Sequence, residues 1–202
     1  MFSPVVRYID TYKTRVRDWC VMRAESTHAY FWLFIIAFTE SSFFLIPPDI
    51  MLASMLLSGA RRVWYLAGLT TLGSVAGGVL GYIIGAFLFE VAGDAIVSTY
   101  GLQTDLLYVQ QLFSDNAFWT IFISAFTPIP YKVFTIASGL FSIDFLTFII
   151  ASLIGRGLRF YIVAYLFKKY GAYIGAILFR YFNILSLGTV GIVVVYILVR
   201  LL

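Results

Sequence analysis

Five ionisable side chains lie in or beside the apolar stretches of this 202-residue chain, and they are its strongest candidates for chemistry. They are Glu40, Asp49, Lys132, Arg156 and Arg159. One unpaired charge at the centre of a membrane helix costs about 2.5–3.5 kcal/mol. Five would cost on the order of 12–17 kcal/mol, more than the net stability of a typical fold. We therefore expect these groups to pair or to reach water, and together they favour a functional site over separate structural charges.

The charges also suggest a ligand. Arg156 and Arg159 are three residues apart, so they share one face of a helix. Asp49 and Lys132 follow two similar proline motifs, and we expect them to form an ion pair. Three positive charges against two negative ones favour a phosphate, which arginine can bind through two parallel hydrogen bonds. The alternative is a network of ion pairs that only braces the protein.

Glu40 stands between "FIIAFT" and "SSFF", and these apolar surroundings favour its neutral form. A carboxyl group that is easily protonated would suit proton coupling. Alternatively, one of the two arginines neutralises it.

The elements that carry these charges are membrane-like. The chain is 61% hydrophobic and 12% charged, whereas a soluble domain is about 45–50% apolar and about 25% charged. The ranges 65–89, 145–167 and 184–202 can each cross a bilayer, which takes roughly 20 residues. We therefore predict an all-α integral membrane protein with a single transmembrane domain over 29–202.

The basic, amphipathic range 1–28 predicts a cytoplasmic helix. It lies either on an anionic membrane surface or against the protein itself. This range shows no cleavable signal peptide.

Prolines interrupt two further apolar ranges. Pro47 and Pro48 lie within 30–57, and Pro128 and Pro130 lie within 117–138. Lysine and arginine cluster at 7–23, 61–62 and 168–180 but are absent from 90–116, and basic loops remain cytoplasmic. Both basic ends of 30–57 lie inside only if that range enters and leaves on the same side. The basic residues at 168–180 lie inside after one crossing at 145–167 only if 117–138 also enters and leaves on one side, here the outer side. We predict two re-entrant hairpins and three full spans, with a cytoplasmic N-terminus; the alternative is two proline-kinked spanning helices.

An internal repeat supports this topology. "LIPPDIMLAS" (45–54) is similar to "PIPYKVFTIAS" (128–138), and each is followed by a glycine and then a glycine-containing span. Two such halves that enter from opposite faces form an inverted repeat, an architecture common in secondary transporters. Within 65–89, glycines recur every fourth residue, a spacing that allows close helix packing. These are Gly73, Gly77, Gly81 and Gly85.

Three motifs resemble a known family: "AFTESSFFLIPPD", "FTPIPYKVFTIASG" and "SLIGRGLRF". They are similar to the YqaA-type branch of the DedA family, whose shared module is also called the VTT or SNARE-associated domain. The resemblance implies a bacterial inner-membrane protein with two facing hairpins. Relatives are implicated in moving undecaprenyl phosphate or phospholipids between leaflets and are tied to the proton motive force. By motif, it implies roles for Glu40, Asp49, Arg156 and Arg159. Many relatives carry arginine near the second proline motif, where this chain has Lys132.

The functional hypothesis is a translocase for a phosphate-bearing lipid. Its transport is either coupled to proton movement or independent of it. The alternatives are a proton-coupled carrier of a small solute and a non-catalytic protein of membrane homeostasis. We expect no enzyme activity, because the sole histidine, His28, lies outside the apolar ranges and no hydrolase motif is present. Cys20 is the single cysteine, so no metal site or cofactor is expected. The expected partners are membrane lipids and no nucleic acid, and homo-oligomerisation stays open.

Overall fold

The computed structural model describes residues 19, 22–24, 26, 28–42, 47–57, 62–93, 110–111, 113–127 and 129–171. Every regular element in these ranges is helical, which confirms the predicted all-α class. The elements are α2 (Ala29–Ser42), α3 (Pro48–Leu57), α4 (Val63–Leu88), the π-helical turn η1 (Phe89–Gly93), α7 (Ala117–Phe126), α8 (Tyr131–Leu140) and α9 (Phe145–Tyr170). The predicted span 184–202 and most of the predicted helix within 1–28 lie outside the described residues.

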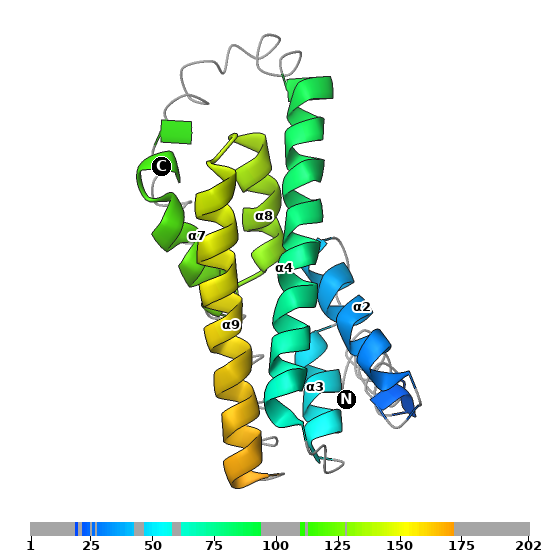
Figure 1. The fold of residues 1–202 in the computed structure, drawn as a ribbon. Coiled ribbons are helices and arrows are strands. Elements are labelled where there is room, and N and C mark those ends of the chain that lie inside the picture. Colours follow the sequence, from blue (N-terminus) through cyan, green and yellow to red (C-terminus); the bar gives the residue numbers. More distant parts are fainter. Residues whose placement is uncertain are drawn as a thin grey trace, which may run out of the picture.

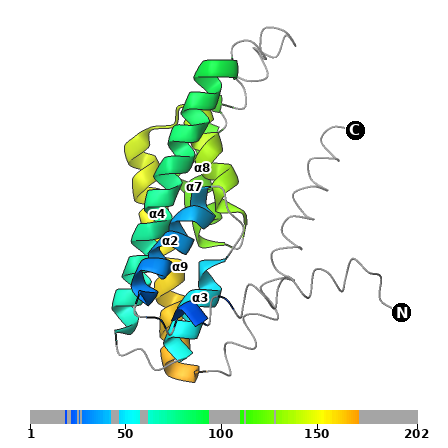
Figure 2. The ribbon, with the colours of Figure 1, turned by 90° about the vertical axis from the view of Figure 1, so that its right-hand side faces the viewer.

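The two long helices run side by side in opposite directions (Figure 1, Figure 2). Both α4 and α9 have 26 residues, a length of about 39 Å, against a hydrocarbon core of about 30 Å. Among the described residues, these two helices are long and apolar enough to cross a membrane. They are the frame against which the four short helices pack.

The chain reverses at both proline motifs. Pro48 is the first residue of α3 and Pro130 immediately precedes α8, positions where the missing amide hydrogen of proline costs least. In Figure 1, α2 and α3 lie along one half of the long helices, and α7 and α8 lie along the other half. In the described residues, α2 and α3 are two separate helices, and so are α7 and α8. The end of α2, the start of α3 and the end of α7 come together near the middle of α9, where Glu40, Asp49 and Thr127 bind its two arginines. Pro47 also precedes α3, whereas Pro128 lies outside the described residues.

Glycines in α4 allow two short helices to approach its backbone. A Cβ atom on Gly77 would overlap the carbonyl group of Phe38 in α2, and one on Gly85 would overlap the carbonyl oxygen of Ile136 in α8. Gly73 also faces α2, and Gly81 faces Thr135 of α8. Thus one half of the glycine face packs against the first hairpin and the other half against the second.

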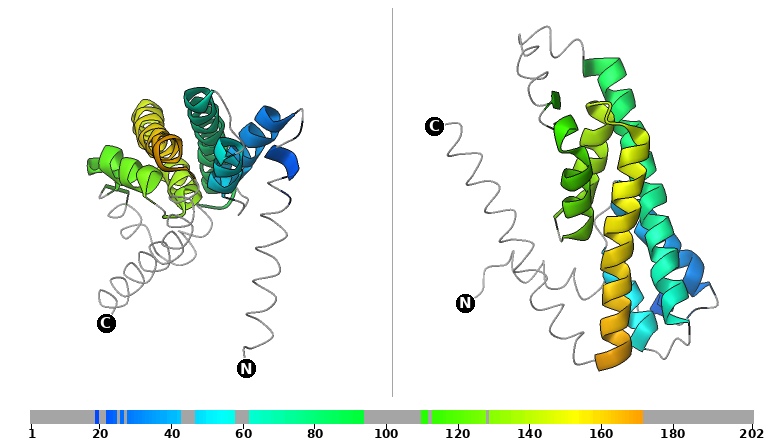
Figure 3. Two further views of the ribbon diagram at one scale, coloured as in Figure 1. Left: turned by 90° about the horizontal axis from the view of Figure 1, so that it is seen from below. Right: turned by 60° about the vertical axis from the view of Figure 1, so that its left-hand side comes forward.

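The remaining short helices pack against α9. Its main short partner is α7, while α3 makes a smaller contact with it. Seen along the long axis, α7, α9, α4 and α2 form a row, with α3 and α8 on the same side of it (Figure 3). Each long helix therefore contacts both hairpins.

Many large apolar side chains are exposed, and several polar side chains are buried beside the apolar core. The outward faces of α4 and α9 carry Leu72, Phe87, Leu146 and Leu153, all exposed. Nine serine or threonine residues and Arg156 are buried in the described part of the chain. Such an extended apolar surface suits contact with lipid.

Candidate functional site

Arg156 lies near the middle of α9 and joins the two hairpins. Its guanidinium Nη2 donates to Glu40 Oε2 at 3.1 Å and to Ser41 Oγ at 3.3 Å, both at the end of α2. Its Cζ lies 4.3 Å from the centre of the Tyr131 ring, at the start of α8. The arginine is 1% exposed. One buried cation thus connects the end of one hairpin helix to the start of another.

Arg159, one turn further along α9, makes a second bridge of the same kind. Its Nη2 donates to Asp49 Oδ2 at 2.6 Å, and its Nη1 donates to the Thr127 carbonyl oxygen at 3.1 Å. Asp49 lies in the first turn of α3, where the helix dipole also favours a negative charge. Thr127 directly follows α7. Arg159 therefore binds one residue beside each of the two proline motifs.

The two ion pairs form one site where the hairpin turns meet. The side chains of Arg156 and Arg159 are 2% and 11% exposed, and those of Glu40 and Asp49 are 19% and 16% exposed. The carboxylates are thus more accessible than the guanidinium groups that hold them. A charge-assisted hydrogen bond in a poorly hydrated site is strong, so each pair contributes to holding α9 against the first hairpin.

Serines extend the site to α4. Ser41 Oγ lies 2.7 Å from Ser74 Oγ and also donates to Glu40 Oε2 at 3.2 Å. Ser42 donates to the Gly77 carbonyl oxygen at 2.9 Å. Sequence analysis did not select these serines or Tyr131, although "TESS" places Ser41 and Ser42 directly after the acid.

The partner of Asp49 differs from the one that the proline motifs suggested. The ion pair observed for this carboxylate is with Arg159, whereas we expected Lys132. Lys132 lies in the first turn of α8, is partly buried and makes an interaction of its own. The structure therefore brings the two arginines together with both acids, and it places Lys132 on the neighbouring helix. Glu40 forms an ion pair with Arg156, as the second of the two possibilities for this acid expected. Proton coupling at Glu40 stays a prediction.

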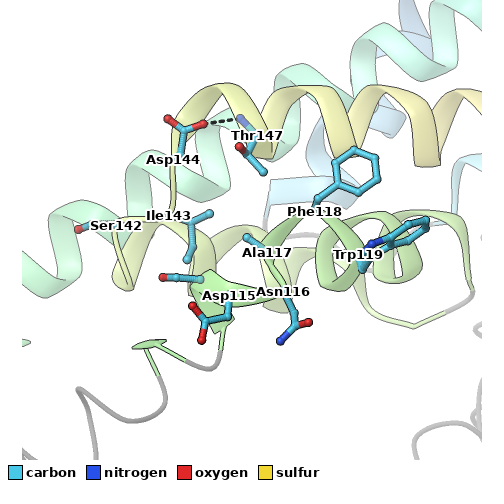
Figure 4. A pocket seen from close by; sticks show the side chains of 10 residues that line it. Asp115, Asn116, Ala117, Phe118, Trp119, Ser142, Ile143, Asp144 and Thr147 are labelled. Atoms are coloured by element: carbon cyan, nitrogen blue, oxygen red, sulfur yellow. Dashed lines mark hydrogen bonds between the residues drawn. The ribbon is translucent and has the colours of Figure 1, made fainter.

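A separate pocket of about 420 Å³ lies near the start of α7 and α9 (Figure 4). Its lining includes Asp115, Asn116, Trp119 and Asp144 and no lysine or arginine. Asp144 begins α9 by accepting a hydrogen bond of 2.7 Å from the Thr147 amide. This pocket offers no cation to a phosphate, and Asp144 is about 18 Å along α9 from Arg156. The arginine site is the better candidate for anion chemistry.

The chemistry available at the arginine site is reversible binding of an anion. Guanidinium groups bind carboxylates and phosphates with the same donor geometry. Among the described residues, no group of three or more histidine, cysteine, aspartate or glutamate side chains is arranged to hold a metal ion. The anions that the two guanidinium groups bind in this structure are the protein's own carboxylates.

Comparison with known proteins gives a family match and sequence relatives. The VTT domain matches residues 46–169. An uncharacterized protein of Haemophilus influenzae is 36% identical over 136 residues, covering 67% of this chain and 70% of its own length. An uncharacterized protein of Histophilus somni is 32% identical over 143 residues, covering 71% and 74% of the two chains.

No solved structure matches. The VTT domain is the shared domain of the DedA family, which is membrane-associated and linked to membrane transport or lipid homeostasis. The matched range contains Asp49, Arg156 and Arg159 and covers more than half of the chain. This protein is therefore a member of the VTT-domain, or DedA, family.

Proposed function

We propose that the protein is a translocase that carries a phosphate-bearing lipid headgroup across the bacterial cytoplasmic membrane. The observation that carries this proposal is the position of Arg156 and Arg159, halfway along a membrane-length helix where both hairpin turns meet. Ionisable groups at this depth typically mark a transport pathway. The acyl chains of the lipid would stay along the apolar outer faces of α4 and α9 while the headgroup passes the arginines.

In this proposal the protein crosses the membrane several times, and the two hairpins are re-entrant from opposite faces. The correspondence between the halves supports this topology: α2 packs on α4 as α7 packs on α9, and α8 contacts α4 as α3 contacts α9. Non-helical backbone at membrane depth is tolerated where protein buries it. The basic end of α9, with Lys168 and Lys169, would then lie on the cytoplasmic side together with the N-terminus.

Competition between carboxylate and phosphate provides the proposed transport step. In the arrangement described, Glu40 holds Arg156 and Asp49 holds Arg159. Protonation of either acid removes its negative charge and releases its arginine for a phosphate. Loss of the proton restores the ion pair and expels the anion. This exchange involves no covalent step and couples headgroup binding to proton binding.

Transport in liposomes tests the proposal. The purified protein is reconstituted with fluorescent undecaprenyl phosphate or phosphatidylethanolamine, and flipping is followed with and without a pH gradient. Arg156→Lys and Arg159→Lys keep the charge but lose the planar pair of donors, so we expect at least a tenfold loss of transport. A lipid with an uncharged headgroup should move more slowly than either phosphate-bearing lipid.

Arg62→Lys is the matched control, because Arg62 is exposed at the start of α4. Thermal unfolding shows that each variant is folded. Wild-type rates in both Arg156→Lys and Arg159→Lys would overturn the phosphate assignment. A pH-driven flux of small solutes with no lipid movement would instead identify a solute transporter.

A further inference from the structure

Three buried polar atoms lie close to the ion pairs but outside them. They are the Tyr131 hydroxyl, the Ser152 Oγ and the Arg156 Nε, and none has a hydrogen-bond partner in the described part of the chain. The three residues are 1%, 0% and 1% exposed. Buried polar groups are nearly always hydrogen-bonded, so three neighbouring exceptions call for a common explanation.

The three atoms converge on the junction of α4, α8 and α9. Ser152 and Arg156 are one turn apart on the same face of α9, so their side chains are neighbours. The guanidinium group of Arg156 covers the Tyr131 ring at 4.3 Å. The Tyr131 hydroxyl lies so close to α4 that a Cβ atom on Gly78 would come within 2.7 Å of it.

The donors and acceptors of the three groups are complementary to those of one water molecule. Arginine Nε can only donate, whereas the two hydroxyl groups can both donate and accept. A single water can accept from Arg156 and exchange one hydrogen bond with each hydroxyl. That makes three hydrogen bonds, the usual number for a buried water. A larger ligand would need to displace side chains that are almost completely buried.

We propose that Tyr131, Ser152 and Arg156 Nε hold a structural water molecule beside the Glu40–Arg156 ion pair. The water restrains the guanidinium group, because it accepts from a nitrogen that the ion pair with Glu40 does not use. It also extends to Tyr131 of α8 the polar connection that runs from Arg156 through Glu40 and Ser41 to Ser74 of α4. This hydration site is independent of which lipid or solute the protein moves.

Radiolytic hydroxyl labelling tests the proposal without any transport assay. X-ray irradiation converts bound water into hydroxyl radicals, which modify the nearest side chains, and mass spectrometry locates the products. Tyr131, Phe148 and Phe160 are equally buried aromatic residues on the same bundle, at 1%, 0% and 0% exposure. We expect Tyr131 to be labelled at least five times faster than either phenylalanine.

Removing one ligand should then reduce this labelling. Ser152→Ala should slow the modification of Tyr131 at least threefold. The control is Ser124→Ala, because Ser124 is also buried but its hydroxyl already donates to the Ile121 carbonyl at 2.8 Å. Labelling of wild-type Tyr131 at the rate of Phe148 would overturn the proposal, even if Ser152→Ala fails to fold. Unchanged Tyr131 labelling in a folded Ser152→Ala protein would also overturn it.

Discussion

Arg159 binds two groups that lie far apart along the chain. The Asp49 carboxylate is 110 residues away, and the Thr127 carbonyl is 32 residues away. A guanidinium group can hold both because its donors point in fixed, divergent directions. Lysine has a single nitrogen on a flexible stem, so it cannot keep both hairpin turns in register. The side chain therefore acts as a geometric link as well as a counter-charge.

The Asp49–Arg159 pair predicts a specific pattern of stability. Asp49→Asn or Arg159→Gln alone leaves one charge without its partner, and we expect each to lower the free energy of unfolding by about 2–3 kcal/mol. The double variant should recover part of this loss, because no buried charge is left over. Detergent-induced unfolding in mixed micelles gives the three values, with Arg62→Gln as the exposed control. If the loss of unfolding free energy in the double variant equals the sum of the two single losses, the two residues do not interact.

Sequence reasoning found the charged residues of the site but not all of their partners. Glu40, Asp49, Arg156 and Arg159 stand out because apolar surroundings make any charge conspicuous. The partner of Asp49 depends on how α9 crosses between the two turns, and no local pattern encodes that crossing. The Tyr131 ring was missed for a related reason, since aromatic residues are common throughout this chain and only the fold places one beneath Arg156.

At the scale of elements, close packing on α4 depends on glycines that have no room for a side chain. Gly77→Ala and Gly85→Ala would place a methyl group against backbone carbonyl oxygens of α2 and α8. We expect each to lower the free energy of unfolding by about 1–3 kcal/mol, despite the better helix propensity of alanine. The neighbouring helix must shift, because a backbone atom cannot rotate away as a flexible side chain can.

Gly157→Ala is the matched control, because a Cβ atom there would lie 3.7 Å from Thr71 Cγ2, an ordinary contact. This variant should be neutral or more stable by up to about 1 kcal/mol. Thermal and detergent-induced unfolding measure all three proteins. If Gly77→Ala and Gly85→Ala are as stable as Gly157→Ala, the close approach of the helices is not needed for stability.

The start of α9 predicts a pH-dependent cap. The hydrogen bond from the Thr147 amide lowers the pKa of Asp144, which lies just outside the apolar part of the helix. The stabilisation that the Asp144 carboxylate gives to the helix is complete above the unfolded-state pKa of about 3.9. It is lost as the pH falls through the pKa of the folded state. Asp144→Ala should lower the melting temperature at pH 7, whereas Asp144→Asn should preserve the cap.

Comparison of wild type with Asp144→Asn between pH 7 and pH 3 isolates this effect, because asparagine does not titrate. The wild type should lose stability relative to the variant at the acidic end of the range. If the stability of the two proteins changes with pH in the same way, the charge of the Asp144 carboxylate does not contribute to stability.

Element boundaries followed the sequence closely where prolines or charges mark them. The ranges 65–89 and 145–167 were expected, and α4 and α9 cover 63–88 and 145–170. The π-helical turn Phe89–Gly93 was not expected, because its residues continue the apolar pattern and nothing in their hydropathy signals a change of pitch. Both hairpin turns were located because proline restricts the backbone wherever it occurs.

For the whole molecule, the decisive prediction concerns topology. In a Cys20→Ser background, Met22→Cys and Leu57→Cys should react only with reagents on the cytoplasmic side, whereas Val91→Cys and Asp115→Cys should react only from outside. All four replaced residues are exposed. This pattern is expected if 30–57 returns to its side of entry as proposed, because both of its ends would then share one compartment. Reaction of Leu57→Cys from outside would show that this range crosses the membrane.

The bridges made by α9 also have a consequence for biosynthesis. Glu40 and Asp49 leave the ribosome 116 and 110 residues before the arginines that bind them. At about 5–20 residues per second, the first hairpin waits roughly 6–23 s for these partners. During this interval its acids are kept in contact with water, protonated or shielded by the insertion machinery. The ion pairs that hold the first hairpin against α9 therefore form only after α9 has been made, whereas the packing of α2 on α4 needs no later helix.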